Sequence, residues 1–204
     1  WSYDESSEFF SKQDFERLFN LKGLSKSSSV FDYKKLDWFN GMYIRKKSTD
    51  ELARLLIPIL VRDGLVGDPP SDEERDKVTA IVPLVQERLR VLYDVSTMVR
   101  FLFQEVNVEN VDDLVPKKKD RAQAKELLQA SRELISVFTD NTDEKNEELF
   151  RAKADEMGVK LGDILLPLRV AMTGSRVSPP LFESIRILGT EKTIERIDRA
   201  KELL

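Results

Sequence analysis

Histidine and cysteine are both absent from the 204 residues of this chain. Without cysteine there is no disulfide framework, thiolate zinc site or thiol nucleophile, and without histidine there is no imidazole base or His-dependent triad. A metal could be bound only through oxygen ligands, and no acidic stretch has the spacing of a calcium-binding loop. We therefore expect neither a catalytic residue nor a metal site, and the composition favours an intracellular helical protein.

Long apolar runs and a large excess of positive charge are missing as well. No run approaches the ~20 apolar residues of a membrane span, so we expect no membrane partner. Lys and Arg number 33 against 37 Asp and Glu, a net charge of −4, whereas general nucleic-acid coats and membrane-surface binders rely on massed positive charge. Because 41% of the residues are apolar, the chain can bury a core. We expect a monomer in the cytoplasm.

Helical periodicity dominates the sequence, and no segment has a convincing strand pattern. Ser11, Ser48 and Ser71 are each followed three residues later by a carboxylate, which predicts helix N-termini. We predict an all-α fold with no significant sheet. Its later helices are expected over 95–105, 119–139, 142–157, 160–173, 179–188 and 191–203. Glycine follows three of these helices, as expected where the chain turns left-handed, at Gly158, Gly174 and Gly189.

The stretch 107–119 has the composition of a linker, acidic at first and basic after Pro116. The net charge is −5 over residues 1–114 and +1 over 115–204, which supports a boundary there. We therefore predict two helical subdomains, 1–114 and 115–204. A natural reading frame does not begin with Trp, and no signal peptide precedes the polar start. We expect the chain to be part of a longer protein whose missing portion lies upstream.

Two further segments have competing interpretations. The Ser-rich stretch 24–28 is predicted to be a connector, because a phosphate-binding Ser-Lys-Ser loop would need a nucleotide-binding sheet and a histidine motif that the chain lacks. The neighbouring aromatic residues Trp38 and Phe39 are expected to pack in the core, and stacking on a nucleic-acid base is the alternative.

The segment 167–183 carries the most specific signal. An otherwise apolar helix contains one arginine, Arg169, and ends at Gly174, and the next helix is expected to begin with Ser178 as its cap and Pro179 in its first turn. A fresh helix N-terminus exposes amides, and a guanidinium adds a planar fork of donors suited to base edges or phosphate. An ordinary helix–loop–helix with a surface arginine is the alternative from these residues alone.

Two separated blocks and the end of the chain together resemble a known family. They are 31–44 (F-D-x-x-K-L-x-W-x-N-x-x-Y-I), 167–183 (P-L-R-V-A-M-T-G, then S-P-P-L-F-E) and 188–191 (L-G-T-E). In this order they resemble the C-terminal half of bacterial glutamyl-tRNA synthetase, and the resemblance covers essentially the whole chain. It implies an anticodon-binding region of two helical subdomains, of the α-helix cage type. The class I catalytic domain would lie upstream, outside this chain.

The resemblance also implies roles for particular residues. The first two anticodon bases would be contacted by Arg169, Ser178, Pro179 and Leu181. The third base would be read by an arginine on the long helix of the first subdomain, which relatives that discriminate between glutamate and glutamine tRNAs possess. That arginine is Arg88, with Arg90 two residues away as the alternative.

The partners implied are the anticodon loop of tRNA(Glu) and the upstream catalytic domain. The intact enzyme would attach glutamate to tRNA using ATP and Mg²⁺. The chain by itself should need no cofactor and catalyse nothing. The competing function is a helical protein-interaction scaffold without an RNA role, because amphipathic helices of this kind suit any bundle.

Overall fold

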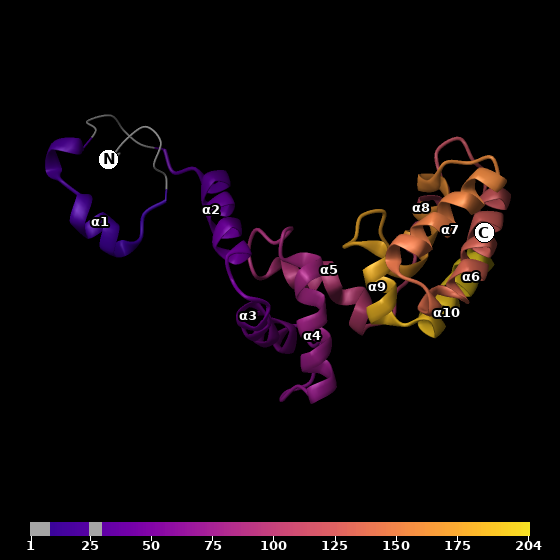
Figure 1. The fold of residues 1–204 in the computed structure, drawn as a ribbon, viewed down its shortest axis with the longest axis horizontal. Helices are drawn as coiled ribbons and strands as arrows, with labels where there is room; N and C mark the ends of the chain where they lie inside the picture. Colours follow the sequence, from indigo (N-terminus) through magenta and orange to yellow (C-terminus); the bar gives the residue numbers. More distant parts are fainter. Residues whose placement is uncertain (1–8, 25–29) are drawn as a thin grey trace. The chain divides into compact units, whose positions relative to one another are not determined.

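A computed structural model describes residues 9–24 and 30–204 of the protein. Every regular element within these ranges is helical (Figure 1), so the all-α prediction is confirmed. The chain divides into two compact units, Trp1–Leu36 and Asp37–Leu204, which are considered separately. Most of the predicted Ser-rich connector, residues 25–28, lies outside the described residues.

The first unit contains a short helix with a complete N-terminal cap. Helix α1 (Lys12–Leu18) begins after Ser11, whose hydroxyl accepts a hydrogen bond from the backbone N–H of Asp14 at 3.0 Å. The Asp14 carboxylate accepts the reciprocal bond from the Ser11 N–H at 3.3 Å. The 3₁₀ helix η1 (Leu21–Gly23) follows. The predicted capping box at Ser11 is therefore confirmed.

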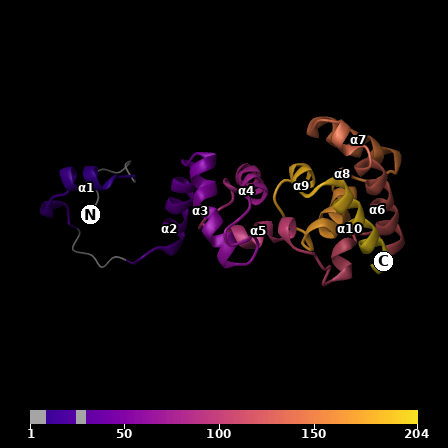
Figure 2. The same cartoon turned by 90° about the horizontal axis from the view of Figure 1, so that it is seen from below.

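Four α-helices make up the earlier part of the second unit: α2 (Tyr33–Arg45, which begins in the first unit), α3 (Thr49–Arg62), α4 (Asp72–Val85) and α5 (Asp94–Phe103). The capping boxes predicted at Ser48 and Ser71 are both present. Helices α3 and α4 pack side by side, as both views show (Figures 1 and 2). Pro58 and Pro83 lie inside these two helices, which continue on either side of them.

The later part of the second unit follows the predicted helices closely. After the 3₁₀ helix η2 (Val111–Leu114) come α6 (Arg121–Ile135), the 3₁₀ helix η3 (Phe138–Asp140), α7 (Asp143–Glu156), α8 (Leu161–Thr173), α9 (Leu181–Leu188) and α10 (Thr190–Leu203). The segment predicted as a linker thus includes η2, which packs against α8 and buries Leu114 completely. In the described part of the chain, no helix has the length and apolar character needed to cross a bilayer.

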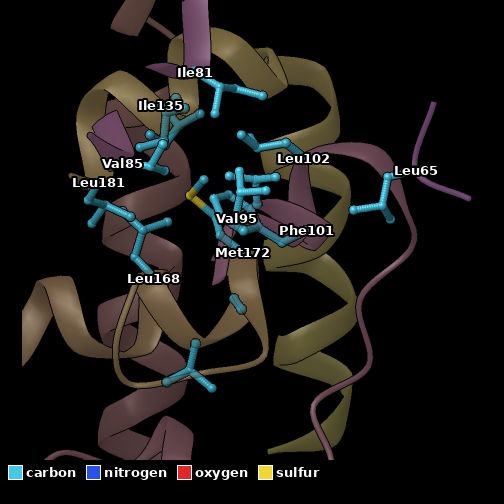
Figure 3. Packing of buried hydrophobic residues seen from close by; sticks show 14 of the residues in the cluster. Leu65, Ile81, Val85, Val95, Phe101, Leu102, Ile135, Leu168, Met172 and Leu181 are labelled. Carbon is cyan, nitrogen blue, oxygen red and sulfur yellow. The ribbon is translucent and has the colours of Figure 1, made fainter. Parts of the chain in front are cut away.

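One cluster of buried side chains joins helices from both ends of the second unit. Figure 3 shows it, with side chains from α4, α5, α8 and α9 gathered around Val95 and Met172. The labelled members on these helices include Ile81, Val85, Phe101, Leu102, Leu168 and Leu181. Helices on either side of residue 114 therefore share a core, and the division into subdomains 1–114 and 115–204 stays a prediction.

The expected burial of Trp38 is wrong, because 46% of this residue is exposed. Helix α2 turns Gly41 and Ile44 inward. At 3.6 residues per turn, Trp38 lies about 120° around the helix from Ile44. Phe39 is half-buried, and its ring meets that of Trp38 edge-on with centroids 5.2 Å apart.

Two glycines with the same backbone conformation test how the end of α8 is packed. Gly158 and Gly174 have φ values of 66° and 70°. A Cβ on Gly158 would meet nothing within 4 Å, whereas one on Gly174 would lie 3.0 Å from the carbonyl oxygen of Asn107 and 3.1 Å from Val106 Cγ1.

We therefore expect Gly158→Ala to cost about 1–2 kcal/mol, the usual cost of left-handed backbone for an L-residue. Gly174→Ala should cost about 1–3 kcal/mol more, because it also overpacks the contact with Asn107. Urea unfolding of both variants measures the difference. Equal losses would mean that the Gly174 contact relaxes freely.

Candidate nucleic-acid interface

The loop between α8 and α9, residues 174–180, is held by its own polar groups. It leaves α8 at Gly174, whose positive φ reverses the chain. The Thr173 hydroxyl lies 3.0 Å from the Ser175 carbonyl oxygen and accepts a bond from the Ser175 N–H at 3.2 Å. The Ser175 hydroxyl in turn accepts from the N–H of Val177 at 3.2 Å. These short-range bonds join residues 173–177 to one another.

Arg169 ties this loop back to α8. The side chain is half-buried, and Nη1 donates to the hydroxyl oxygen of Ser178 and, at 3.2 Å, to the carbonyl oxygen of Pro179. The hydroxyl of Ser178 donates to the same carbonyl at 2.8 Å. The predicted cap at Ser178 is therefore wrong. Helix α9 starts at Leu181, with Pro180 in the cap position, because the arginine engages the hydroxyl that would have capped the helix.

Arg88 contacts the same loop from a position 90 residues before Ser178 in the sequence. Its Nη1 donates to the carbonyl oxygen of Ser178 at 2.7 Å. The prediction that Arg88 lies on a helix is wrong: α4 ends at Val85, and Arg88 lies in the turn that follows. The N–H groups of Arg88 and Leu89 both donate to the Val85 carbonyl, and Leu89 is buried. This tight turn leaves Arg88 exposed and directs its guanidinium to the loop.

The two guanidiniums create local positive charge on a chain that is negative overall. In the described part of the chain, their hydrogen-bond partners are neutral oxygens of Ser178 and Pro179. Burial first, and then the positive charge of Arg88, lower the pKa of Arg169. Arginine remains protonated in proteins. Among the described residues neither guanidinium forms an ion pair with a carboxylate, so the site offers charged donors, which suit a ligand rich in acceptor oxygens and nitrogens.

A cavity of about 420 Å³ is lined by Arg88 and by Ser178 and Pro179, the two residues to which Arg169 donates its hydrogen bonds. It combines apolar surface from Met98, Phe101 and Val177 with polar groups. The remaining lining residues are Pro179 and the polar residues Arg88, Thr97, Thr173, Ser175 and Ser178. A flat ligand with apolar faces and a polar edge, such as an unstacked nucleobase, matches this mixture. No sequence motif marks Thr97, Met98 or Phe101, which is why the sequence did not predict their place at the site.

Of the predicted site residues, Arg88, Arg169, Ser178 and Pro179 come together here. Leu181 follows immediately, but its side chain is only 6% exposed and belongs to the core (Figure 3). Any contact from Leu181 would use its backbone N–H, because first-turn amides of a helix have no intrahelical acceptor. Arg90 does not line the cavity. Its carbonyl oxygen accepts a bond from Asn40 Nδ2 at 2.6 Å, and its side chain is exposed.

Within the ranges that the structure describes, no three Asp or Glu residues are grouped in a way that could hold a metal ion.

Comparison with known proteins identifies the class. The family model of the anticodon binding domain matches residues 51–201. This match covers most of the chain, which therefore belongs to that family.

The relatives carry a more particular name. The glutamate–tRNA ligase of Treponema denticola is 41% identical over 218 aligned residues, covering 98% of the chain and 43% of the ligase. The glutamate–tRNA ligase of Borreliella burgdorferi is 39% identical over 204 residues, covering 100% of the chain and 42% of the ligase. The chain thus spans less than half the length of these relatives. The predicted resemblance to the anticodon-binding half of this enzyme is confirmed.

A solved structure supports the fold independently. The crystal structure of a glutamate tRNA ligase from Elizabethkingia meningosepticum, in complex with its amino acid, superposes with a TM-score of 0.79. The superposition covers 100% of the chain and 39% of that protein at 24% sequence identity. At this identity the likeness concerns the fold alone.

The contacts of Arg169 predict how the loop responds when they are removed. Arg169→Ala deletes its hydrogen bonds to Ser178 and Pro179, so the loop should open more often. A net loss of ~0.5–1.5 kcal/mol corresponds to about 2- to 10-fold faster native-state cleavage by trypsin after Arg176. Mass spectrometry of the fragments measures the rate. Arg151→Ala, which removes only an exposed ion pair with Glu147 on α7, should leave it unchanged. Equal rates in both variants would show that Arg169 does not hold the loop.

Proposed function

We propose that this chain is the anticodon-recognition module of a glutamate–tRNA ligase and that it binds the anticodon loop of tRNA(Glu). The observation that carries the proposal is the convergence of Arg88 and Arg169 on Ser178, beside a cavity of about 420 Å³. Arg88 is 90 positions and Arg169 is 9 positions before Ser178 in the sequence, and both donate hydrogen bonds to neutral oxygens of this residue. Their remaining donors are available to a ligand.

The chemistry of the site suits single-stranded RNA. Sequence-specific RNA readers take unstacked loop bases, pack their faces against side chains and bond to their edges. Met98 and Phe101 supply apolar surface, and the guanidiniums supply directed donors. In this proposal Arg169, Ser178, Pro179 and the backbone of Leu181 contact the first two anticodon bases, and Arg88 contacts the third. A local group of donors is sufficient, so the net charge of −4 is compatible with binding.

The intact protein, in this proposal, attaches glutamate to tRNA with ATP and Mg²⁺, and its catalytic domain lies upstream of this chain. It works as a monomer in the cytoplasm. The module contributes specificity and no catalytic group. The matched relatives given above are all named as ligases, which supports this function over the helical-scaffold alternative.

A binding comparison tests the proposed function directly. An unmodified glutamate anticodon stem-loop and a stem-loop with a scrambled anticodon are titrated at the same salt concentration, because phosphate attraction alone depends on salt and not on sequence. We expect tighter binding to the glutamate anticodon by about 1–3 kcal/mol per base contact that is read. Equal binding to both loops would favour the scaffold.

The third anticodon base, C in tRNA(Glu) and G in tRNA(Gln), is the point at which Arg88 acts. The pairing edge of cytosine presents O2 and N3 as acceptors, whereas guanine presents N1–H and an amino group with O6 as its one acceptor. A guanidinium carries donors only, so it can pair with cytosine and meets the donors of guanine unfavourably. Each unpaired buried donor costs about 1–3 kcal/mol, which is enough for a substantial preference.

We therefore expect the wild type to prefer C over G at the third base and Arg88→Gln to lose most of that preference. Affinity for the two stem-loops measures it. Arg90→Gln is the matched control, because Arg90 lies two residues away and does not line the cavity. A wild type indifferent to the base, or an Arg88→Gln variant with an unchanged preference, would remove Arg88 from the site. Loss of preference in Arg90→Gln alone would transfer the role to Arg90.

A further inference from the structure

Side chains on one face of α10 bind the residues that follow α5, Gln104 and Glu105. Lys192, Arg196 and Arg199 are spaced four and three residues apart, so they lie on the same side of the helix. Lys192 and Arg199 both bind the carboxylate of Glu105, the latter with 2.5 Å between Nη2 and Oε2. Bonds from Lys192 and then from Arg199 lower the pKa of Glu105 to about 2. Glu105 therefore stays ionised and attached to α10 at neutral pH.

Arg196 makes a different kind of contact from its neighbours. Nη2 donates to the carbonyl oxygen of Gln104 at 2.9 Å, and Nη1 donates to the carbonyl oxygen of Met172 at 2.5 Å. Gln104 is the C-terminal cap of α5, and Met172 lies in the last turn of α8. The final carbonyls of a helix have no intrahelical donor, and a cation there also complements the helix dipole. One guanidinium thus completes the ends of two helices.

Burial makes this arrangement specific to arginine. Arg196 is only 3% exposed, and its Nε has no hydrogen-bond partner among the residues that the structure describes. An apolar side chain there would avoid the unsatisfied Nε, but it would leave both carbonyl oxygens without this donor. The two carbonyls therefore account for the arginine, since its rigid planar fork can reach both at once. A lysine carries a single ammonium on a flexible stem and has no such fork.

The two helices that Arg196 joins are those that form the candidate interface. Helix α5 supplies Thr97, Met98 and Phe101 to the cavity, and α8 supplies Arg169 and leads into the loop. Arg196 itself does not line this cavity. Its hydrogen-bond partner Met172 is the residue immediately before Thr173, and Thr173 lines the cavity.

We propose that Arg196 is a positioning residue for anticodon recognition, which sets the spacing between α5 and the α8–α9 loop and thereby the fit of a base beside Arg88. This rests on the proposed function, because the ligand is taken to be an anticodon base. The residue acts through the carbonyls of Gln104 and Met172 and touches no ligand.

The test compares Arg196→Met and Arg196→Lys with Arg132→Met. Arg132 is the control arginine, because its side chain joins α6 to Asp198 of α10 at 2.9 Å, whereas the Arg196 bonds go to α5 and α8. Variants are measured under conditions in which circular dichroism shows them folded. The readout is the ratio of affinities for stem-loops with C and with G at the third base. We expect both Arg196 variants to reduce this ratio by about 2- to 30-fold, the range of indirect coupling, and Arg132→Met to preserve it.

A uniform loss of affinity for both stem-loops, with the ratio unchanged, would overturn the proposal, since a merely structural residue gives that result. So would an Arg196→Lys variant with the wild-type ratio, or failure of both Arg196 variants to fold under any condition. Native-state hydrogen exchange supplies a readout without RNA. Faster exchange at 97–101 and 174–180 in the Arg196 variants, but not in Arg132→Met, supports positioning even if the wild type proves to bind no anticodon. Unchanged exchange at both segments overturns it.

Discussion

The hydrogen bonds from Arg88 and Arg169 to a single residue, Ser178, organise the candidate interface. They bring together two like charges, which repel each other, on a loop that has no carboxylate to balance them in the described part of the chain. Neutral oxygens accept hydrogen bonds from some of the N–H groups of each guanidinium, but they do not neutralise its positive charge. A ligand that brings acceptors lowers this repulsion, so the charge of the site favours an electron-rich partner. The loop is held in position before the ligand arrives, which reduces the entropy lost on binding.

This convergence depends on the core beneath it. Arg88 follows α4 and Arg169 lies on α8, and both helices contribute to the buried cluster that also contains α5 and α9. Val85, the last residue of α4, and Leu168, the neighbour of Arg169, are both fully buried. Arg169 is therefore next to a buried residue and Arg88 lies three residues after one, so the reach of each arginine is limited to its own side chain and a short turn. Packed interiors transmit displacement because they have little free volume.

Local signals in the sequence predicted the elements well. Capping boxes at Ser11, Ser48 and Ser71 are satisfied within four residues, and the positive φ of Gly174 reflects a backbone requirement that glycine meets. One prediction failed because a partner from another element competes with a local one. Ser178 has the sequence of a helix cap, but Arg169 engages its hydroxyl. Likewise, the cavity-lining residues of α5 carry no pattern of their own, because only the packing of α5 near the loop gives them a role.

The donor set of the interface has a consequence for the conditions under which it operates. One arginine, Arg88, and four residues with hydroxyl groups line the cavity, and the whole chain has no histidine. Side chains of these types do not change protonation between about pH 5 and 9. The charge that a ligand meets is therefore constant across the range in which a cell's internal acidity varies. A site lined in this way keeps the same charge and the same hydrogen-bonding groups during acid or alkaline stress.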